Sequence, residues 1–297
     1  MPEGHSVRRL AIQFQDVFAG RRLSVSSPQG RFAEGAALLD GRVMTHAHAH
    51  GKQLFLGFED GLWLHVHLGL YGAWEFGGDS SFRGASSIGA PRRIGEREKF
   101  DDDGDVAYVG PPEPVGAVRV RLVSEHGWAD LRGASRCDAV TGTEAEAAWS
   151  KLGPDPLHDG FEGHDGDGAE FVRRLRAKRT AVGQLLMDQG VVAGIGNIYR
   201  AEMLYRAGID PFRPGTSLSG EEAGALWRDA VKLLADGVRD GRIITTDPGS
   251  WAGEAPADDE AFYVYQKQGR PCGRCGTPIA LKEMAGRKLY WCPGCQH

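Results

Sequence analysis

Two residues at the start of the chain have the chemistry of a covalent catalyst. The sequence opens Met1-Pro2-Glu3-Gly4-His5, and removal of Met1 would give Pro2 a secondary α-amine. An α-amine titrates at about pH 8, so part of it is neutral at pH 7 and can add to an electrophilic carbon to form an iminium ion. Glu3 offers a carboxyl for proton transfer. A proline after the initiator methionine is commonplace, so these residues alone do not indicate catalysis, and the rest of the sequence must show whether Pro2 has a catalytic role.

The strongest local signal is a pair of Cys-x-x-Cys sequences near the C-terminus. Cys272 and Cys275 form the first pair, and Cys292 and Cys295 form the second. Their spacing predicts a tetrahedral Zn²⁺ site with four thiolate ligands on a β-hairpin, and an iron site or a redox pair is the alternative. We expect one structural zinc ion per chain, which stiffens a hairpin too small to fold alone.

Other candidate binding residues stand beside glycines or between the cysteine pairs. Arg287 would lie on the metal-pinned hairpin, where a guanidinium suits a phosphate. Leu70 and Tyr71 form an apolar pair flanked by glycines, which is unusual for a solvated loop. They are either the end of a core strand or a wedge that inserts into something planar. Lys52 follows a glycine at the edge of a predicted strand and, by itself, is typical of a solvated lysine.

A glycine-rich stretch from Gly190 to Asn197 joins two predicted helices. Such a double turn can present backbone N–H groups and a helix N-terminus to an anion. A tight helix–helix connection explains the glycines equally well. No strand precedes the stretch, so it is not a dinucleotide-binding fingerprint.

A helix and several strands must position the N-terminal residues. Apolar residues at helical spacing predict a helix over 6–19, which places Pro2 just before a helix N-terminus, where the macrodipole disfavours a cation. Three histidines at period two, His46, His48 and His50, lie on one strand face, which is more often a polar face than a metal site. Strands are expected within 43–75, at 118–123 and at 128–131, with a loop-like excursion over 77–117 that could hide a short strand near 106–109.

The second half of the chain is predicted to be helical. An acidic, glycine-rich linker over 155–170 separates the halves, and Ser219 and Glu222 form a capping box that opens a helix to about Val238. The other predicted helices are 144–151, 171–177, 181–189 and 197–207, and 245–260 is expected to be a loop.

Charge and hydropathy limit the partners. The 297 residues carry a net charge of −5, which alone argues against an anionic partner. From Lys267 onward, however, the single acid Glu283 stands among several cations, so an anionic partner would meet the C-terminal end. The chain has no apolar run long enough for a membrane span and no signal-peptide pattern, so we expect a cytoplasmic protein.

With these pieces in order, the chain resembles the Fpg/Nei family, that is, formamidopyrimidine-DNA glycosylase and endonuclease VIII. The resemblance runs nearly from end to end, and the order of the motifs makes coincidence improbable. The motifs are Met1-Pro2-Glu3-Gly4, Gly51-Lys52, Leu70-Tyr71-Gly72, Leu152-Gly-Pro-Asp-Pro-Leu157, Asp188-Gln-Gly-Val-Val-Ala-Gly-Ile-Gly-Asn-Ile-Tyr199 and the finger that ends Trp291-Cys-Pro-Gly-Cys-Gln296.

The resemblance implies an α+β multidomain fold. It consists of an N-terminal helix with a two-sheet β-sandwich (1–138), a helical domain with a helix–two-turn–helix motif (139–260) and a four-cysteine zinc-finger β-hairpin (261–297). The implied partner is damaged double-stranded DNA, bound by a monomer associated with the nucleoid.

The resemblance also implies a role for each candidate residue. Pro2 would attack C1′ of a flipped nucleotide while Glu3 acts as general acid, and β-elimination would follow. Lys52 would hold a phosphate and assist proton transfer. Arg287 would grip the phosphates that flank the lesion and take part in δ-elimination. Asn197 would contact a phosphate, and Leu70-Tyr71 would fill the gap in the base stack.

The chain departs from the family pattern in two places. The family commonly begins Pro-Glu-x-Pro-Glu, whereas His5 and Ser6 stand at the second Pro and Glu here, so a second acid is missing. The Fpg branch carries an Arg-Arg-Phe wedge after its later N-terminal strands, and the region assigned to it here, 125–132, has no Phe. Leu70-Tyr71-Gly72 is more similar to the endonuclease VIII branch, although its usual Gln is replaced by Gly69. Oxidised pyrimidines are therefore favoured over 8-oxoguanine.

Three functional hypotheses follow. The first is a bifunctional DNA glycosylase/AP lyase of base excision repair. The second is an enzyme that acts mainly as an AP lyase on abasic or single-stranded DNA. The third is a zinc-finger protein that binds damaged DNA without catalysis.

Overall fold

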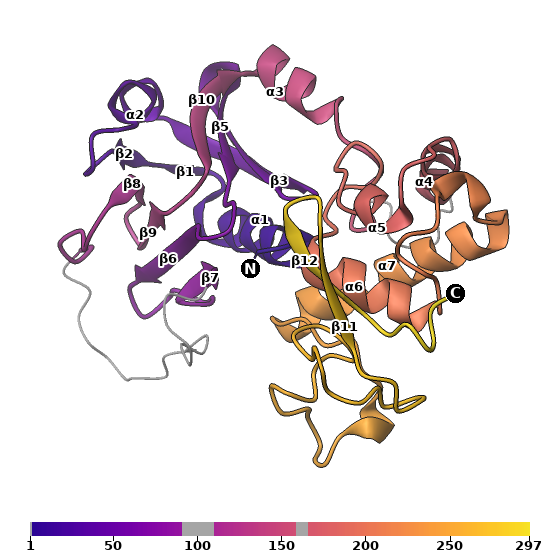
Figure 1. The fold of residues 1–297 in the computed structure, drawn as a ribbon. Coiled ribbons are helices and arrows are strands. Elements are labelled where there is room, and N and C mark those ends of the chain that lie inside the picture. Colours follow the sequence, from indigo (N-terminus) through magenta and orange to yellow (C-terminus); the bar gives the residue numbers. More distant parts are fainter. Residues whose placement is uncertain (1, 91–109, 159–165) are drawn as a thin grey trace. The chain divides into compact units, whose positions relative to one another are not determined.

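The computed structural model describes residues 2–90, 110–158 and 166–297, with the side chains of 166 and 167 excepted. The chain divides into two compact units, Met1–Ser150 and Lys151–His297, called unit 1 and unit 2 below (Figure 1). Strand β10 runs past residue 138, and helix α3 completes unit 1. None of the helices that the structure describes has the length and apolar character needed to cross a membrane.

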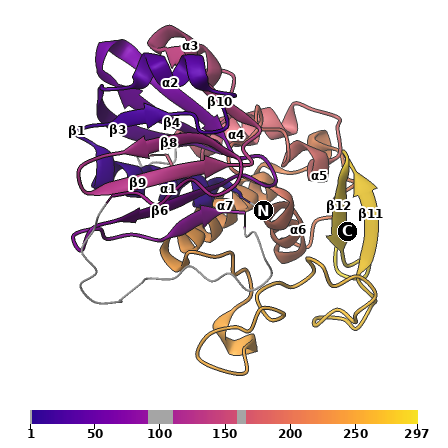
Figure 2. The same ribbon diagram turned by 90° about the vertical axis from the view of Figure 1, so that its left-hand side faces the viewer.

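Unit 1 contains two antiparallel sheets of five strands each, which lie one above the other in Figure 2. The first sheet has the order β1-β3-β4-β5-β10, and its strands are Arg21–Arg22, Val43–His50, Gln53–Phe58, Leu62–His67 and Arg136–Thr141. The second has the order β2-β8-β9-β6-β7, with strands Ser24–Ser26, Val118–Val123, Gly127–Arg132, Ala73–Gly78 and Ser87–Gly89. The predicted two-sheet sandwich is thus confirmed.

Helix α1 (Gly4–Phe18) forms part of the core of unit 1. Its buried stripe includes Leu10, Phe14 and Phe18, and the Phe14 ring meets the Trp74 ring edge-on at 4.8 Å. Each such side chain contributes roughly 1.5–3 kcal/mol through burial, so the helix that carries the N-terminus is firmly fixed. The predicted helix is confirmed, although it begins two residues earlier than expected.

Several short elements of unit 1 escaped the sequence prediction. Strand β7 lies inside the stretch predicted to be a loop over 77–117, so that prediction is wrong at Ser87–Gly89, while residues 106–109 lie outside the described residues. Helix α2 (Ala33–Leu39) and the 3-10 turn η1 (Glu59–Gly61) were also missed, whereas α3 (Gly142–Trp149) was predicted, at 144–151. Thr141 and Glu144 cap α3 reciprocally, which is a local reason for its start.

Unit 2 is helical up to its C-terminal hairpin. Its helices are α4 (Gly166–Arg176), α5 (Val182–Leu185), α6 (Asn197–Arg206) and α7 (Gly220–Asp240), with 3-10 turns η2 (Gly215–Ser217) and η3 (Pro248–Ser250). Much of the predicted acidic linker, residues 159–165, lies outside the described residues. The capping box at Ser219 and Glu222 is confirmed, since each side chain accepts a hydrogen bond from the other residue's backbone N–H.

The predicted helix 181–189 is wrong beyond its first turn, because α5 stops at Leu185. Asp188 redirects the chain: its carboxylate accepts from Gly190 N at 3.0 Å, and its carbonyl accepts from Val191 N at 2.8 Å. An aspartate that bonds to nearby backbone N–H groups competes with the helix. The two turns after α5 therefore replace its predicted second half.

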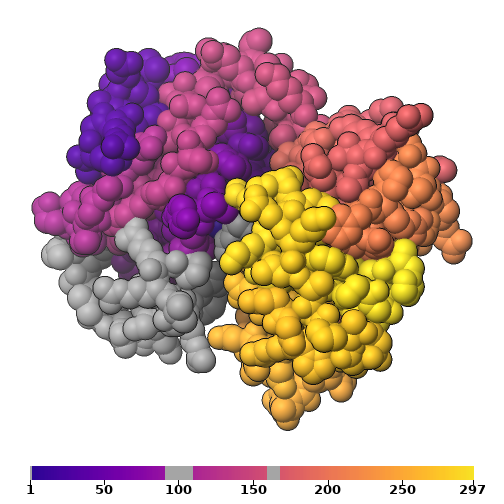
Figure 3. All heavy atoms as spheres, in the orientation of Figure 1, coloured from indigo at the N-terminus to yellow at the C-terminus, as the bar shows by residue number. Residues whose placement is uncertain are grey.

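The chain ends in a two-stranded hairpin, β11 (Ala280–Met284) and β12 (Arg287–Trp291). Ala285 and Gly286 form its turn with φ of 51° and 69°, as in the two-residue turn that suits the twist of a hairpin. In Figure 3 this yellow segment packs on the orange helical part of its own unit. The predicted zinc-finger hairpin is confirmed.

Candidate active site and metal centre

The N-terminal pair lies at the start of α1. Glu3 is the N-cap residue, and its carbonyl accepts hydrogen bonds from Ser6 N at 3.0 Å and Val7 N at 3.4 Å. Pro2 and Glu3 are both buried, and Glu3 has an exposed fraction of 0%. A buried carboxyl next to Pro2 is in a suitable place to exchange a proton with chemistry at the Pro2 nitrogen, which becomes an amine once Met1 is removed.

His5 is buried and neutral at physiological pH. Burial is the main cause that lowers its pKa to about 3, and the positive charges of Arg9 and the N-terminal amine add to the effect. Its Nε2 lies 3.1 Å from Ser6 Oγ. A neutral imidazole with a lowered pKa supplies neither the negative charge nor the acidic proton of the carboxyl group that the family commonly has near the start of the chain.

Lys52 and the Leu70-Tyr71 pair lie at the same edge of unit 1. Lys52 stands in the turn between β3 and β4, and its charge acts on His67, the last residue of β5. Burial is the largest cause that lowers the pKa of His67, and the charges of Lys52 and then Arg136 lower it further. The chain leaves β5 at His67 and enters the Leu70-Tyr71 segment directly afterwards.

Residues 69–72 form a tight turn, called the Tyr71 turn below. Tyr71 is 79% exposed, more than the other exposed large hydrophobic side chains that the structure describes, and Leu70 is half-buried. Gly72 N donates to Leu68 O at 3.0 Å and closes the turn. The structure thus presents Tyr71 on the surface, as a wedge would require, and does not place it in the core.

Glycines allow the backbone to pack closely beneath this turn. A Cβ on Gly72 would lie 2.3 Å from Leu68 O, and one on Gly133 would lie 2.5 Å from Tyr71 O. Gly69 and Gly133 also have positive φ, 68° and 65°, a conformation that disfavours other residues. The turn is therefore held mainly by backbone contacts that leave no room for side chains.

The segment that lies against the Tyr71 turn is the β9–β10 loop, and this corrects the sequence comparison. Residues 125–132 form the β8–β9 turn and strand β9, and Gly127 pairs with Gly78 at the far end of β6. Ser135 lies instead at the near end: its Oγ is 2.7 Å from His67 Nδ1, and its N donates to His67 O at 3.0 Å. This neighbouring loop also lacks a Phe.

The three histidines of β3 pack against tryptophans. The His46 and His48 rings meet edge-on at 5.0 Å, and His46 contacts Trp63 at 4.6 Å. Trp149 Nε1 donates to His50 Nδ1 at 2.7 Å. These contacts describe a packed polar strand face and do not bring the three rings together around one point.

Asn197 is the first residue of α6 and is 5% exposed. Its Nδ2 donates to Lys288 O at 2.9 Å, and its Oδ1 accepts a hydrogen bond from Arg200. Lys288 follows Arg287 on β12, so Asn197 and Arg287 are brought close together although they are far apart in the sequence.

The backbone N–H groups of the glycine-rich turns are largely used within the unit. Val191 N and Val192 N donate to Asp188 O, Ala193 N donates to Pro154 O, and Gly194 N donates to Gln189 Oε1. For these four amides the tight helix–helix connection is therefore the correct interpretation. An anion would have to use other groups at the start of α6.

Arg287 stands at the tip of the finger, immediately after the turn of residues 285–286, called the finger turn below. Its side chain is exposed, and among the described residues Nη1 donates only locally, to Gly286 O at 3.2 Å. An exposed guanidinium at a hairpin tip is available to a phosphate.

The four cysteines fit a zinc ion. Their sulfur atoms all lie within 4.8 Å of one another, with Cys272 and Cys295 Sγ 3.8 Å apart and Cys275 and Cys292 Sγ 3.5 Å apart. A tetrahedral site with Zn–S bonds of about 2.3 Å requires S–S distances of about 3.8 Å. Within the described part of the chain they are the one group of three or more potential ligand side chains gathered in this way. The predicted structural zinc site is confirmed.

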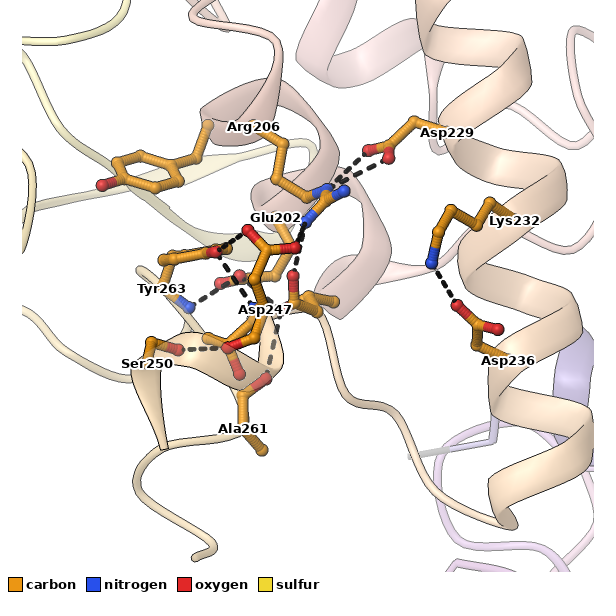
Figure 4. A network of polar contacts seen from close by, with 12 residues as sticks. Glu202, Arg206, Asp229, Lys232, Asp236, Asp247, Ser250, Ala261 and Tyr263 are labelled. Carbon is orange, nitrogen blue, oxygen red and sulfur yellow. Dashed lines mark hydrogen bonds and ion pairs between the residues drawn. The ribbon is translucent and has the colours of Figure 1, made fainter. Parts of the chain in front are cut away.

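A buried carboxylate joins α6 to the segment that leads into the finger (Figure 4). Glu202 is 0% exposed and accepts four hydrogen bonds. The donors are Thr245 Oγ1 at 2.7 Å, Tyr263 N at 2.7 Å, Val264 N at 2.9 Å and Tyr265 N at 2.7 Å. Because its lone pairs are satisfied, this buried charge stabilises the connection.

Arg206, one turn further along α6, continues the network (Figure 4). Its Nε lies 3.0 Å from both Asp229 oxygens, and Nη1 donates to Thr245 O at 2.7 Å. Tyr263 OH donates to Asp247 Oδ2 at 2.7 Å. Helices α6 and α7 and both ends of the 245–263 segment are thereby tied together.

Comparison with known proteins agrees with this geometry. Three domain families match: the formamidopyrimidine-DNA glycosylase N-terminal domain over residues 1–123, its H2TH domain over 152–248, and the zinc finger found in FPG and IleRS over 269–297. "Endonuclease 8 1" of Mycobacterium bovis is 40% identical over 299 residues and covers 100% of both chains. The chain belongs to the Fpg/endonuclease 8 family.

Formamidopyrimidine-DNA glycosylases are similar to the chain at lower identity. The formamidopyrimidine-DNA glycosylase of Sodalis glossinidius is 31% identical over 88% of this chain and 84% of that protein. The crystal structure of Fpg from Thermus thermophilus has a TM-score of 0.70 and 28% identity, covering 99% and 98% of the two chains. A complex of a Lactococcus lactis Fpg mutant with Fapy-dG-containing DNA has a TM-score of 0.72 at 21% identity over both full chains, which supports the fold.

Members of the Fpg/endonuclease 8 family are DNA N-glycosylases and AP lyases of base excision repair, and the predicted family and enzyme class are confirmed. Sequence reasoning missed three residues that shape the site: Ser135, Glu202 and Tyr205, whose hydroxyl oxygen lies 3.2 Å from Cys272 Sγ. Their partners are distant in the sequence, and no local motif marks them.

Proposed function

We propose that this DNA glycosylase/AP lyase uses Pro2 as its nucleophile and favours oxidised pyrimidines. The observation that carries the proposal is the placement of Pro2 beside the fully buried Glu3 at the start of α1. The 40% identity to "Endonuclease 8 1", whose name marks the endonuclease 8 branch, supports the substrate class. The Leu70-Tyr71-Gly72 sequence supports it as well.

The covalent step starts when the Pro2 nitrogen attacks C1′ of a flipped nucleotide. The N–C1′ bond forms, and the bond from C1′ to the base breaks with its electron pair going to the base, which leaves with the proton that the Pro2 nitrogen gives up. Glu3 gives a proton to the sugar oxygen as the ring opens and the C1′–O bond breaks, which leaves an iminium between the Pro2 nitrogen and C1′. The resulting iminium makes the C2′ proton acidic. Loss of that proton breaks the C3′–O bond, and a second elimination breaks the C5′–O bond.

The phosphate contacts are assigned to Lys52, Arg287 and Asn197. Lys52 holds a phosphate at the edge of unit 1 and assists proton transfer, and the exposed Arg287 grips the phosphates beside the lesion and assists δ-elimination. The Asn197 amide has two N–H groups: one donates to Lys288 O, and the second is the proposed phosphate donor. Such contacts position DNA and do not read its sequence.

The Tyr71 turn is assigned to the gap left by the flipped nucleotide. An exposed ring on a closely packed backbone can replace a base in the stack, as apolar wedges do in other DNA-binding proteins. We further propose that the protein acts as a cytoplasmic, nucleoid-associated monomer on damaged double-stranded DNA. The division into 1–138, 139–260 and 261–297 is our proposal for its domains.

Borohydride trapping on abasic DNA tests the nucleophile. Protein whose mass confirms the loss of Met1 should form a covalent adduct, because borohydride reduces the iminium to a stable amine. A matched protein with an N-terminal extension that cannot be removed should form none. An adduct of equal yield from the extended protein would overturn the assignment of Pro2, and no adduct from either would favour a non-catalytic damage-binding protein.

One observation favours a second candidate function, an enzyme that acts mainly on abasic sites. His5 is neutral and Ser6 carries no charge, so the second acid is missing, and expulsion of a base needs more acid assistance than opening an abasic sugar. Comparing trapping rates on a thymine-glycol duplex and on an abasic strand distinguishes the two. Equal or faster reaction with thymine glycol would exclude the lyase-dominant function.

A further inference from the structure

The four-cysteine end of the finger, called the zinc end below, contacts α6 through side chains that have no role in the proposed reaction. Tyr205, in the last turn of α6, is 1% exposed, and its OH lies 3.2 Å from Cys272 Sγ. Cys272 also accepts from Arg274 N at 3.4 Å, the local N–H···S bond of a Cys-x-x-Cys knuckle. The tyrosine is the partner that comes from outside the finger.

Arg274 holds Tyr205 in this position. Its guanidinium carbon lies 4.2 Å from the centre of the Tyr205 ring, and Nη1 donates to Tyr205 O at 2.9 Å. A cation over the ring face and a bond to the same residue's carbonyl restrict the tyrosine rotamer. The phenol is thereby aimed at the cysteine sulfur.

Charge explains why such donors are useful. One Zn²⁺ and four thiolates carry a net charge of −2, and Cys272 and Cys292 are buried. Buried charge requires hydrogen-bond donors or nearby cations, and donors around the ligands orient them and strengthen metal binding. Tyr205 supplies a hydrogen-bond donor, and Arg274 supplies a nearby cation.

The same helix reaches the other end of the finger. Asn197, its first residue, bonds to Lys288 O next to Arg287, while Tyr205 contacts the zinc end. A helix of this length has a rise of about 1.5 Å per residue, so it braces the hairpin at two separated points. A third contact runs through Gln296, which accepts from Cys292 N at 2.8 Å and donates to Ile209 O at 2.9 Å.

We propose that Tyr205 is a positioning residue of the zinc centre, an outer donor to the Cys272 thiolate that makes α6 part of the metal site. Arg274 orients Tyr205, and the retained zinc keeps Arg287 in register with Asn197. The inference rests on the zinc centre and not on the assignment of Pro2, so it can fail independently of the proposed function.

Zinc release to a chromophoric chelator tests the proposal. Tyr205→Phe removes only the hydroxyl, and zinc should leave about tenfold faster, the lower end of the effect of losing such a partner. Tyr290→Phe is the matched control, because Tyr290 is buried in the same apolar cluster and its ring packs on Tyr265 at 5.2 Å. Release from Tyr205→Phe within twofold of both wild type and control would overturn the proposal.

A spectroscopic measurement separates the hydrogen bond from general loosening. In Co²⁺-substituted protein, loss of a donor raises the energy of the thiolate lone pairs, so the sulfur-to-cobalt charge-transfer band should move to longer wavelength in Tyr205→Phe. It should stay in place in Tyr290→Phe. Faster zinc release without this band shift would also overturn the direct role of the hydroxyl.

Discussion

Tyr71 in unit 1 and Arg287 in unit 2 are both exposed side chains at tight turns, but different forces hold the two turns. The Tyr71 turn rests on backbone packed so closely that a Cβ on Gly72 or Gly133 would collide with it. Around the finger turn, Gly286 has open space for a Cβ, and the order comes from four cysteines and side-chain hydrogen bonds from α6. The Tyr71 turn should therefore be sensitive to added side-chain volume, and the finger turn to the loss of polar or metal contacts.

Removal of zinc should have the largest effect and should act on one unit only. Structural zinc contributes about 10–16 kcal/mol to small fingers, so chelation or Cys292→Ser should unfold β11 and β12. Hydrogen exchange should show immediate loss of protection in these two strands, with the amides of β6 and β9 unchanged. In a separate binding assay, DNA affinity should fall sharply. Loss of protection in both units would contradict the separation.

Gly72→Ala tests the opposite sensitivity. The new Cβ would lie 2.3 Å from Leu68 O, so the substitution should lower the unfolding free energy of unit 1 by about 1–3 kcal/mol and leave zinc release unchanged. Gly142→Ala is the control, because its Cβ would meet only ordinary contacts at 3.7 Å. Urea unfolding measures the unfolding free energy of both variants. Equal destabilisation by Gly72→Ala and Gly142→Ala would refute the close-packing explanation.

Acid should weaken unit 1 through His5. Its folded pKa of about 3 lies below the unfolded value of 6.5, so the unfolded state binds the proton first and stability falls as pH drops below 6.5. At pH 5 the loss is about 2 kcal/mol. The stability advantage of wild type over His5→Gln, measured by urea unfolding, should therefore shrink by about 2 kcal/mol between pH 8 and pH 5. An advantage that does not change over this range would contradict the prediction.

Arg287→Ala should have the smallest effect on folding and a selective effect on DNA. The side chain is exposed, and within the described ranges it donates one hydrogen bond, to the neighbouring Gly286, so stability should not change. DNA affinity should fall for all sequences, and the slope of log affinity against log salt should become shallower by about one. Arg239→Ala, whose guanidinium pairs with Asp236 and Asp240 on α7, should leave the slope unaltered.

These two turns also mark how far sequence alone could lead. The finger was predictable, because the spacing of the four cysteines from Cys272 to Cys295 is what a tetrahedral zinc site on a hairpin requires. The capping box of Ser219 and Glu222 was predictable for the same reason, since both partners lie within one turn. In each case the sequence contains the whole local interaction.

The contacts that position the candidate residues were not predictable. Ser135 lies against His67, and Tyr205 lies against Cys272, and each contact depends on how strands or helices pack after folding. Strand β7 was missed because three residues give too short a pattern. The second half of the predicted helix 181–189 failed because Asp188 offered the backbone a better local partner than the helix did.

The anchoring of the segment between α7 and the finger has a consequence for insertions in this segment. Thr245 N donates to Ala261 O at 2.9 Å, and Thr246 Oγ1 donates to Glu260 O at 2.8 Å, so the two ends of the intervening loop are stitched together at its base. A loop closed in this way tolerates insertions, because doubling its length costs only about 0.6 kcal/mol in closure entropy. Insertions in this stretch should therefore cost little stability while Glu202 keeps the finger in place.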